Sequence, residues 1–201
     1  MDESGFSTVP NRPPKVLSTK GKRYVNKISS AERGTNVTVV CTVSASGQNI
    51  SHAFIYPSKR MKTELLDGAP SLSIGMVSDN SFINQNLFVK YTTHFRDRAK
   101  PTKEQPVLLI MDNHTSHCSI AANYFFRQYN IIVLTLSPHS SYRMQPLDKC
   151  FLGPLKKFYS DECEKWLTNH PGRVITVYQI ASIFAPAFFK AATIMNAIEG
   201  F

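Results

Sequence analysis

The chain has 201 residues, of which 42% are hydrophobic and 18% are charged, a globular composition that excludes an intrinsically disordered protein. That length is enough to bury a core, and we expect a single domain over residues 1–201. The formal net charge of +9 at pH 7 favours a polyanionic partner such as nucleic acid, but charge alone does not identify it.

Hydropathy and cysteine spacing exclude two further classes. The longest apolar runs, such as Val107–Met111, are far too short to cross a bilayer, so we expect no membrane-spanning segment and no membrane partner. The four cysteines form no CxxC pair and no short zinc spacing. They are expected to be reduced thiols in a cytosolic or nuclear protein.

The first half of the chain contains a predicted hairpin and a predicted helix. Residues 1–34 are rich in Pro, Gly and Lys/Arg and are expected to form a loop, either a solvated connection or an arm that faces DNA. Residues 36–43 and 52–56 are rich in β-branched and aromatic side chains and flank a turn at Gly47, which predicts an antiparallel hairpin. Apolar residues at helical spacing then predict an amphipathic helix over 82–98.

The second half predicts a β–α–β unit and two more helices. Residues 107–111 and 131–136 are continuous apolar runs, as expected for parallel strands buried on both faces and joined by a right-handed crossover. Ser116 is the expected cap of the intervening helix. Its buried stripe is predicted to comprise Ile120, Tyr124 and Phe125. Helices follow at about 150–169 and 177–195.

Three aspartates are candidates for one site. Asp112 ends the first apolar strand, and ligands gather at the carboxyl ends of strands in α/β sheets. Asp148 follows the next strand after a polar loop, and Asp2 joins them if it lies on a strand beside 107–111. Three carboxylates repel one another unless cations neutralise them, and hard oxygen ligands suit two Mg²⁺ or Mn²⁺ ions. Each aspartate alone is as readily explained as a helix cap or loop residue.

The joint pattern resembles the DDE superfamily endonuclease domain of pogo-type transposases, including the jerky and Tigger groups. The matching segments are DESGF at 2–6, SAERGTNVTVV at 30–40, LLIMDNHTSH at 108–117 and SPHSSYRMQPLDKCFLGPLK at 137–157. They cover most of residues 2–165. The resemblance implies an α/β fold with an RNase H-like mixed sheet flanked by helices. It also implies that Asp2, Asp112 and Asp148 are the catalytic, metal-binding triad.

The same resemblance implies phosphodiester chemistry with two metal ions, DNA as partner and nuclear localisation. It leaves open whether the protein forms a homodimer. In the family, the strand that carries the first aspartate lies mostly before it, so we expect the first central strand to be truncated here, in a gene remnant or a fragment. Within residues 1–201 we also expect no helix-turn-helix DNA-recognition domain of the kind that such transposases carry.

Several residues beside the triad admit two interpretations. His117 either faces the scissile phosphate or bonds near a helix start. Gln145 lies on the loop that the resemblance places over the site. Arg143 and Lys149 flank Asp148 and are candidate phosphate contacts, which would make DNA affinity depend on salt.

Two functional hypotheses remain open at the level of sequence. The first is a DNA-cleaving or strand-transferring domain, and the second is a non-catalytic nucleic-acid-binding or protein-interaction module with the same fold. An unrelated α/β hydrolase or transferase is disfavoured, since neither GxSxG nor GxxxxGK[ST] occurs.

Overall fold

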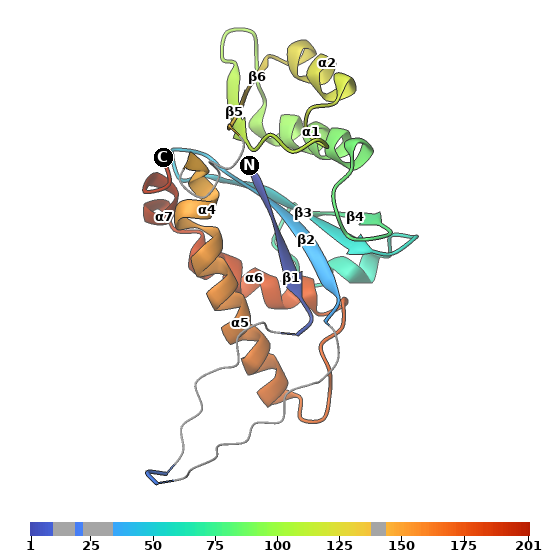
Figure 1. The fold of residues 1–201 in the computed structure, drawn as a ribbon, viewed down its shortest axis with the longest axis vertical. Helices are drawn as coiled ribbons and strands as arrows, with labels where there is room; N and C mark the ends of the chain where they lie inside the picture. Colours follow the sequence, from blue (N-terminus) through green and yellow to red (C-terminus); the bar gives the residue numbers. More distant parts are fainter. Residues whose placement is uncertain (10–18, 22–33, 138–143) are drawn as a thin grey trace.

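The computed structural model describes residues 1–9, 19–21, 34–137 and 144–201 (Figure 1). Its strands are β1 (Asp2–Ser7), β2 (Asn36–Val43), β3 (Asn49–Pro57), β4 (Ile74–Ser78), β5 (Val107–Met111) and β6 (Ile131–Thr135). Its α-helices are α1 (Gln85–Ala99), α2 (Ile120–Gln128), α4 (Pro146–Cys150), α5 (Leu152–Asn169), α6 (Ile180–Ala191) and α7 (Ile194–Ile198). A 3₁₀ turn, η1, covers Thr63–Leu66.

The described strands form two sheets. The larger one has the order β1-β2-β3-β4, in which β1, β2 and β3 are antiparallel neighbours and β3 pairs with β4 in parallel. The smaller one is a parallel pair of β5 and β6. The hairpin predicted from residues 36–56 is therefore confirmed as β2 and β3, and the predicted parallel pairing of the two apolar runs is confirmed as β5 and β6.

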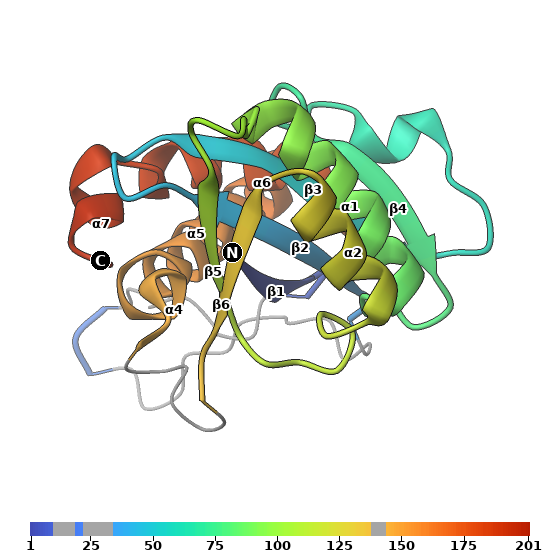
Figure 2. The same cartoon turned by 90° about the horizontal axis from the view of Figure 1, so that it is seen from above.

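The larger sheet separates two hydrophobic cores. One face packs against α4, α5, α6 and α7 through a core that includes Phe6, Phe54 and Phe184. The other face packs against α1, α2 and β5 through a core that includes Val40, Ile55 and Phe88. The two layers of helices lie on opposite sides of the sheet in both views (Figures 1 and 2).

The two sheets meet at the beginning of β1. The Met1 amino nitrogen donates a 2.8 Å hydrogen bond to the Ile110 carbonyl oxygen on β5. No backbone ladder joins β1 to β5 among the described residues, because β1 pairs only with β2. The condition set for Asp2, a strand paired beside 107–111, is therefore not met by backbone pairing among the described residues.

Three sequence predictions are wrong for identifiable reasons. Strands β5 and β6 are not buried on both faces, since Leu108, Ile132 and Leu134 are exposed. The reason is that the helices from α4 to α7 cover the larger sheet and not these two strands. Helix α2 is capped by the Ser119 hydroxyl, not by Ser116. The buried residues of α2 are Ala122 and Phe126, whereas Ile120 and Tyr124 face outward.

The beginning and end of the chain also differ in detail from the prediction. Part of the expected loop 1–34 is strand β1, and β4 was not predicted. The helix expected over 82–98 is α1, which begins three residues later because Asn84 caps it by accepting from the Leu87 backbone N–H. The helices expected at 150–169 and 177–195 are observed as two pairs, α4 with α5 and α6 with α7.

Phe184 provides a test of the core between the larger sheet and the helices α4 to α7. It is fully buried, and its ring lies 5.0 Å from that of Phe6 and 5.2 Å from that of Phe54. Because truncation leaves a cavity, Phe184→Ala should lower the free energy of unfolding by about 3–5 kcal/mol in urea denaturation. Phe189→Ala on the same helix is the control, since Phe189 is 65% exposed. Equal effects of the two substitutions would contradict this packing.

Candidate metal centre

Two adjacent carboxylates on β1 face opposite sides of the sheet. Successive side chains of a strand alternate between its faces. Asp2 shares its face with Phe6, which packs in the core with α5 and α6, and its carboxyl group interacts electrostatically with Asp148 on α4. Glu3 points the other way and contacts His117 in the segment between β5 and α2. Asp2 therefore approaches α4, whereas the adjacent Glu3 contacts the segment after β5.

Asp2 and Asp148 are the two carboxyl groups of the site that repel each other. Asp2 Oδ1 accepts a 2.8 Å hydrogen bond from the Glu3 backbone N–H. Burial, followed by repulsion from Asp148, raises the pKa of Asp2 to about 7. Asp148 itself lies in the first turn of α4 and is exposed, which confirms that it starts a helix. A cation between these two carboxylates would relieve their repulsion.

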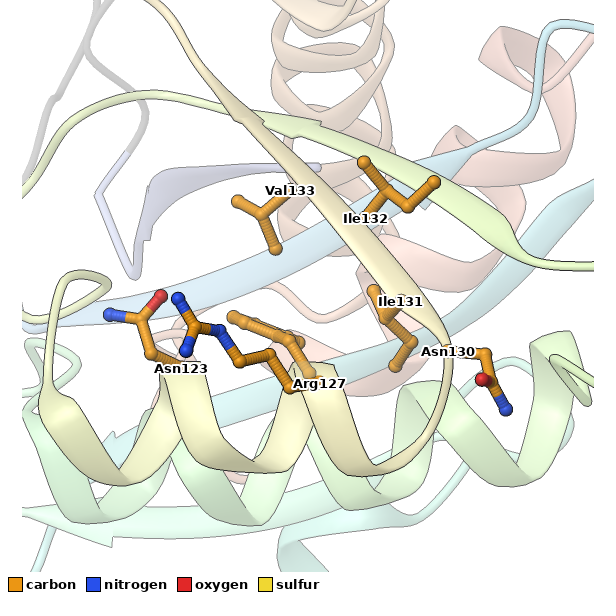
Figure 3. Close-up of a pocket in the computed structure, with 7 residues that line it drawn as sticks. Asn123, Arg127, Asn130, Ile131, Ile132 and Val133 are labelled. Carbon is orange, nitrogen blue, oxygen red and sulfur yellow. The ribbon is translucent and has the colours of Figure 1, made fainter. Parts of the chain in front are cut away.

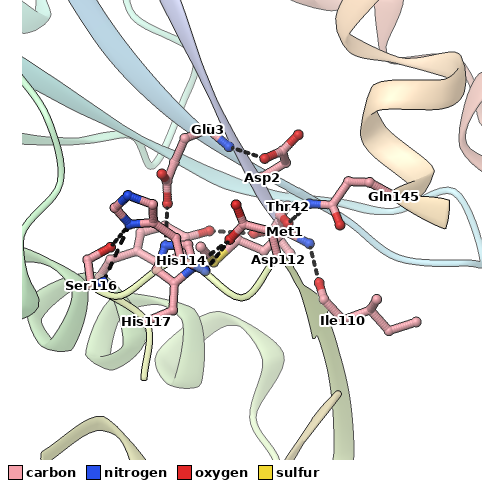
Figure 4. A network of polar contacts seen from close by, with 11 residues as sticks. Met1, Asp2, Glu3, Thr42, Ile110, Asp112, His114, Ser116, His117 and Gln145 are labelled. Carbon is pink, nitrogen blue, oxygen red and sulfur yellow. Dashed lines mark hydrogen bonds and ion pairs between the residues drawn. The ribbon is translucent and has the colours of Figure 1, made fainter. Parts of the chain in front are cut away.

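Asp112 lies directly after β5 and is held by His117 (Figure 4). The His117 Nδ1 atom lies 2.8 Å from Asp112 Oδ1, as an ion pair. The His114 backbone N–H also donates to Oδ1, at 3.3 Å. The contact with His117 lowers the pKa of Asp112. Among the described residues, Oδ2 of Asp112 has no such contact.

His117 also contacts Glu3. Its Nε2 atom lies 2.7 Å from Glu3 Oε1, and the ring is 2% exposed. Burial of the imidazole opposes its charge, but the contacts with Asp112 and Glu3 outweigh burial and raise the pKa of His117 to about 9. Of the two interpretations of His117, bonding near the start of a helix is therefore the one observed, with acidic partners on both ring nitrogens.

Gln145 fixes the backbone next to Asp2. Its Nε2 donates a 2.8 Å hydrogen bond to the Met1 carbonyl oxygen. The side chain is 1% exposed, and its Oε1 has no hydrogen-bond partner among the described residues. Figure 4 shows Gln145 approaching Met1 from the side opposite His117. Gln145 therefore ties the segment before α4 to the first residues of β1.

The donor types at this site fit a hard divalent cation, but the described side chains are not arranged as a finished metal cage. Asp2 and Asp148 are close enough to interact, and the contacts of Asp112 with other described residues are made through Oδ1. Carboxylate oxygens are the ligands that Mg²⁺ and Mn²⁺ prefer. Within the described residues, however, no three acidic, His or Cys side chains surround one metal position.

The nucleic-acid contacts predicted beside Asp148 are only partly described. Lys149 is exposed on α4, next to Asp148, where its ammonium group is accessible to a phosphate. Arg143 lies outside the described residues. Of the helices that the structure describes, none combines the length and apolarity needed to cross a membrane.

One surface pocket lies away from the three aspartates. A pocket of about 410 Å³ between α2 and β6 is lined by Asn123, Phe126, Arg127 and residues 130–133 (Figure 3). It contains none of the three aspartates. The three aspartates therefore lie outside this pocket.

Sequence reasoning missed the role of Glu3 and the two partners of His117. Glu3 follows Asp2 directly, and His117 is five residues after Asp112, so both lie within the quoted motifs. The alternation of a strand was the available signal, because it places Glu3 on the face opposite Asp2. The partner across that face could not be identified without the position of the segment after β5.

Comparison with protein families identifies one match. The family model described as DDE superfamily endonuclease matches residues 35–200, which include Asp112 and Asp148. The chain is also 29% identical over 206 residues to the protein named MFS-type transporter clz9 from Cochliobolus lunatus, and covers 22% of it.

Solved structures show the same fold. The chain resembles the Mos1 transposase paired-end complex with left transposon end with a TM-score of 0.52 at 13% identity, covering 95% of this chain and 54% of that one. The Mos1 mariner paired end complex with Mn gives a TM-score of 0.50 at 14% identity, over 95% and 51% of the two chains. The fold is therefore α/β and RNase H-like, and the chain spans about half of these proteins.

The raised pKa of Asp2 predicts how stability depends on pH. A carboxyl group whose pKa is higher in the folded state favours folding below its unfolded pKa, and that contribution is lost as the pH rises through about 7. Without metal, the unfolding free energy should therefore fall from pH 4 to pH 8 more in the wild type than in Asp2→Asn, by about 1–3 kcal/mol. Urea denaturation in EDTA measures this, and parallel pH profiles would contradict it.

Proposed function

We propose a function for this chain from one premise: it belongs to the DDE superfamily endonuclease family. The function is cleavage of DNA, or transfer of DNA strands, with divalent metal ions held by Asp2, Asp112 and Asp148. The observation that carries this proposal is the convergence of β1, the end of β5 and α4, which brings the Asp2 carboxyl group within electrostatic reach of Asp148 and fixes Asp112 beside Met1 and Glu3 (Figure 4).

The three aspartates would act as metal ligands. Mg²⁺ and Mn²⁺ suit their hard oxygen donors, and one of the similar solved structures is described as a complex with Mn. A pair of such ions supplies activation of the attacking oxygen and stabilisation of the leaving oxygen in phosphodiester chemistry. The chain's own contribution is to hold Asp2 near Asp148, with a raised pKa of Asp2 as the consequence, and to hold Asp112 through its Oδ1.

DNA is the proposed substrate and partner. The net charge of +9 favours a polyanion, and the similar structures are described as transposon-end and strand-transfer complexes. Lys149 is exposed beside Asp148 and is the proposed phosphate contact, together with Arg143. We further propose that the protein works in the nucleus, where its substrate lies, and that it can act as a homodimer.

A non-catalytic derivative is the second candidate, and one observation favours it. The described residues do not surround a metal position with three ligands. A module that retains the fold and binds DNA through phosphate contacts alone would tolerate this arrangement. The two candidates differ in one measurable property, which is metal-dependent cleavage.

Plasmid nicking separates these two candidates. With Mg²⁺ or Mn²⁺, the wild type should nick supercoiled DNA, and Asp112→Asn or Asp148→Asn should reduce the rate at least ~100-fold, as loss of a central electrostatic contribution does. Asp161→Asn is the matched control, since Asp161 is exposed on α5. Nicking that persists in Asp112→Asn would point to a contaminating nuclease and contradict the proposal. Absent nicking with retained DNA binding would favour the non-catalytic derivative.

The contribution of Lys149 is measurable by salt dependence. If its ammonium group contacts a phosphate, Lys149→Gln should weaken DNA binding for all sequences and reduce the slope of log K against log [salt] by about 1. Lys59→Gln removes the same charge from an exposed position after β3 and should leave the slope nearly unchanged. Fluorescence anisotropy at several salt concentrations measures both. Equal slopes for the two variants would show that Lys149 acts only through net charge.

A further inference from the structure

His117 lies between two carboxylates from different sheets. Its Nε2 is 2.7 Å from Glu3 Oε1 on β1, and its Nδ1 is 2.8 Å from Asp112 Oδ1 after β5. Glu3 and Asp112 are 109 positions apart in sequence, so the imidazole joins two distant segments. Figure 4 labels all three residues in one network of polar contacts.

The surroundings of His117 hold its ring in one place. The side chain is 2% exposed, and the Phe88 ring lies 4.5 Å from it at an interplanar angle of 33°. The neighbouring His114 differs: it is exposed and its Nδ1 contacts the Ser116 hydroxyl at 2.7 Å. Only His117 is thus both packed against α1 and in contact with acidic residues on both ring nitrogens, among the histidines that the structure describes.

The bridge replaces a missing backbone connection. In a continuous sheet, a ladder of hydrogen bonds would fix the end of β5 relative to β1. Here the described backbone supplies one hydrogen bond, from Met1 to Ile110. The position of the Asp112 carboxylate relative to Asp2 must therefore be fixed largely by side chains, and the bridge through His117 reaches that carboxylate directly.

We propose that Glu3 and His117 are positioning residues for Asp112: together they anchor its Oδ1 to β1 and thereby present its Oδ2 to the metal. The inference rests on the proposed function, because it assumes that Asp112 is a metal ligand. The imidazole has a nitrogen on each of two ring edges and contacts one carboxylate with each, whereas a glutamine amide carries its donor hydrogens on a single nitrogen. Residues that orient a metal ligand in this way typically contribute ~10–100-fold to metal affinity.

Mn²⁺ titration calorimetry on the full chain tests the inference with four variants and with Asp112→Asn as the reference for a lost site. His117→Gln should weaken Mn²⁺ affinity by ~10–100-fold, and Glu3→Gln, which preserves side-chain shape, should weaken it in the same direction. The double variant should bind Mn²⁺ with the same affinity as His117→Gln alone, because the effects of substituting two residues that act as one unit do not add. Glu104→Gln, at an exposed position before β5, is the matched control and should bind as the wild type does. Thermal melts establish that each variant is folded.

The outcomes distinguish this inference from the proposed function. Folded His117→Gln and Glu3→Gln variants that bind Mn²⁺ as tightly as the wild type, even with lowered melting temperatures, would show a purely structural bridge and overturn the inference alone. Losses that multiply in the double variant would also overturn it, since the two residues would then act separately. A wild type that binds no more Mn²⁺ than Asp112→Asn would overturn the proposed function, and this inference with it.

Discussion

The alternation of side chains along β1 is the constraint on which the rest of the site depends. Because neighbouring residues of a strand face opposite ways, Asp2 meets α4 while Glu3 meets the segment after β5. A strand shifted by one residue would exchange these faces and direct Phe6 away from its aromatic partners. The packing of Phe6 in the core between the larger sheet and helices α5 and α6 therefore sets the direction of both carboxylates.

Polar side chains, more than backbone, join the two sheets at this point. Glu3, His117 and Asp112 form one connection, and Gln145 forms another through the Met1 carbonyl. Such contacts are strong when buried, but the loss of one partner leaves the other unsatisfied. The geometry of the site consequently depends on a few individual residues to a greater degree than it would in a sheet with a continuous ladder.

The sequence predicted local features better than it predicted how distant elements meet. The β2–β3 hairpin, the parallel pairing of β5 with β6 and the position of Asp148 at a helix start follow from residue type and periodicity, and the structure has all three. The exposed faces of β5 and β6 did not follow, since apolar runs do not reveal which helices cover them. The bridge through His117 also depends on tertiary placement, because its partners lie 114 and 5 positions away.

The most direct test of the account is a crystal structure of the chain grown with Mn²⁺ and measured for anomalous scattering. The account predicts an anomalous peak that has oxygens of Asp2, Asp112 and Asp148 as ligands, with His117 still in contact with Asp112 Oδ1. A structure with no peak at these carboxylates, or with Mn²⁺ bound only elsewhere, would contradict the assignment of this site as a metal centre.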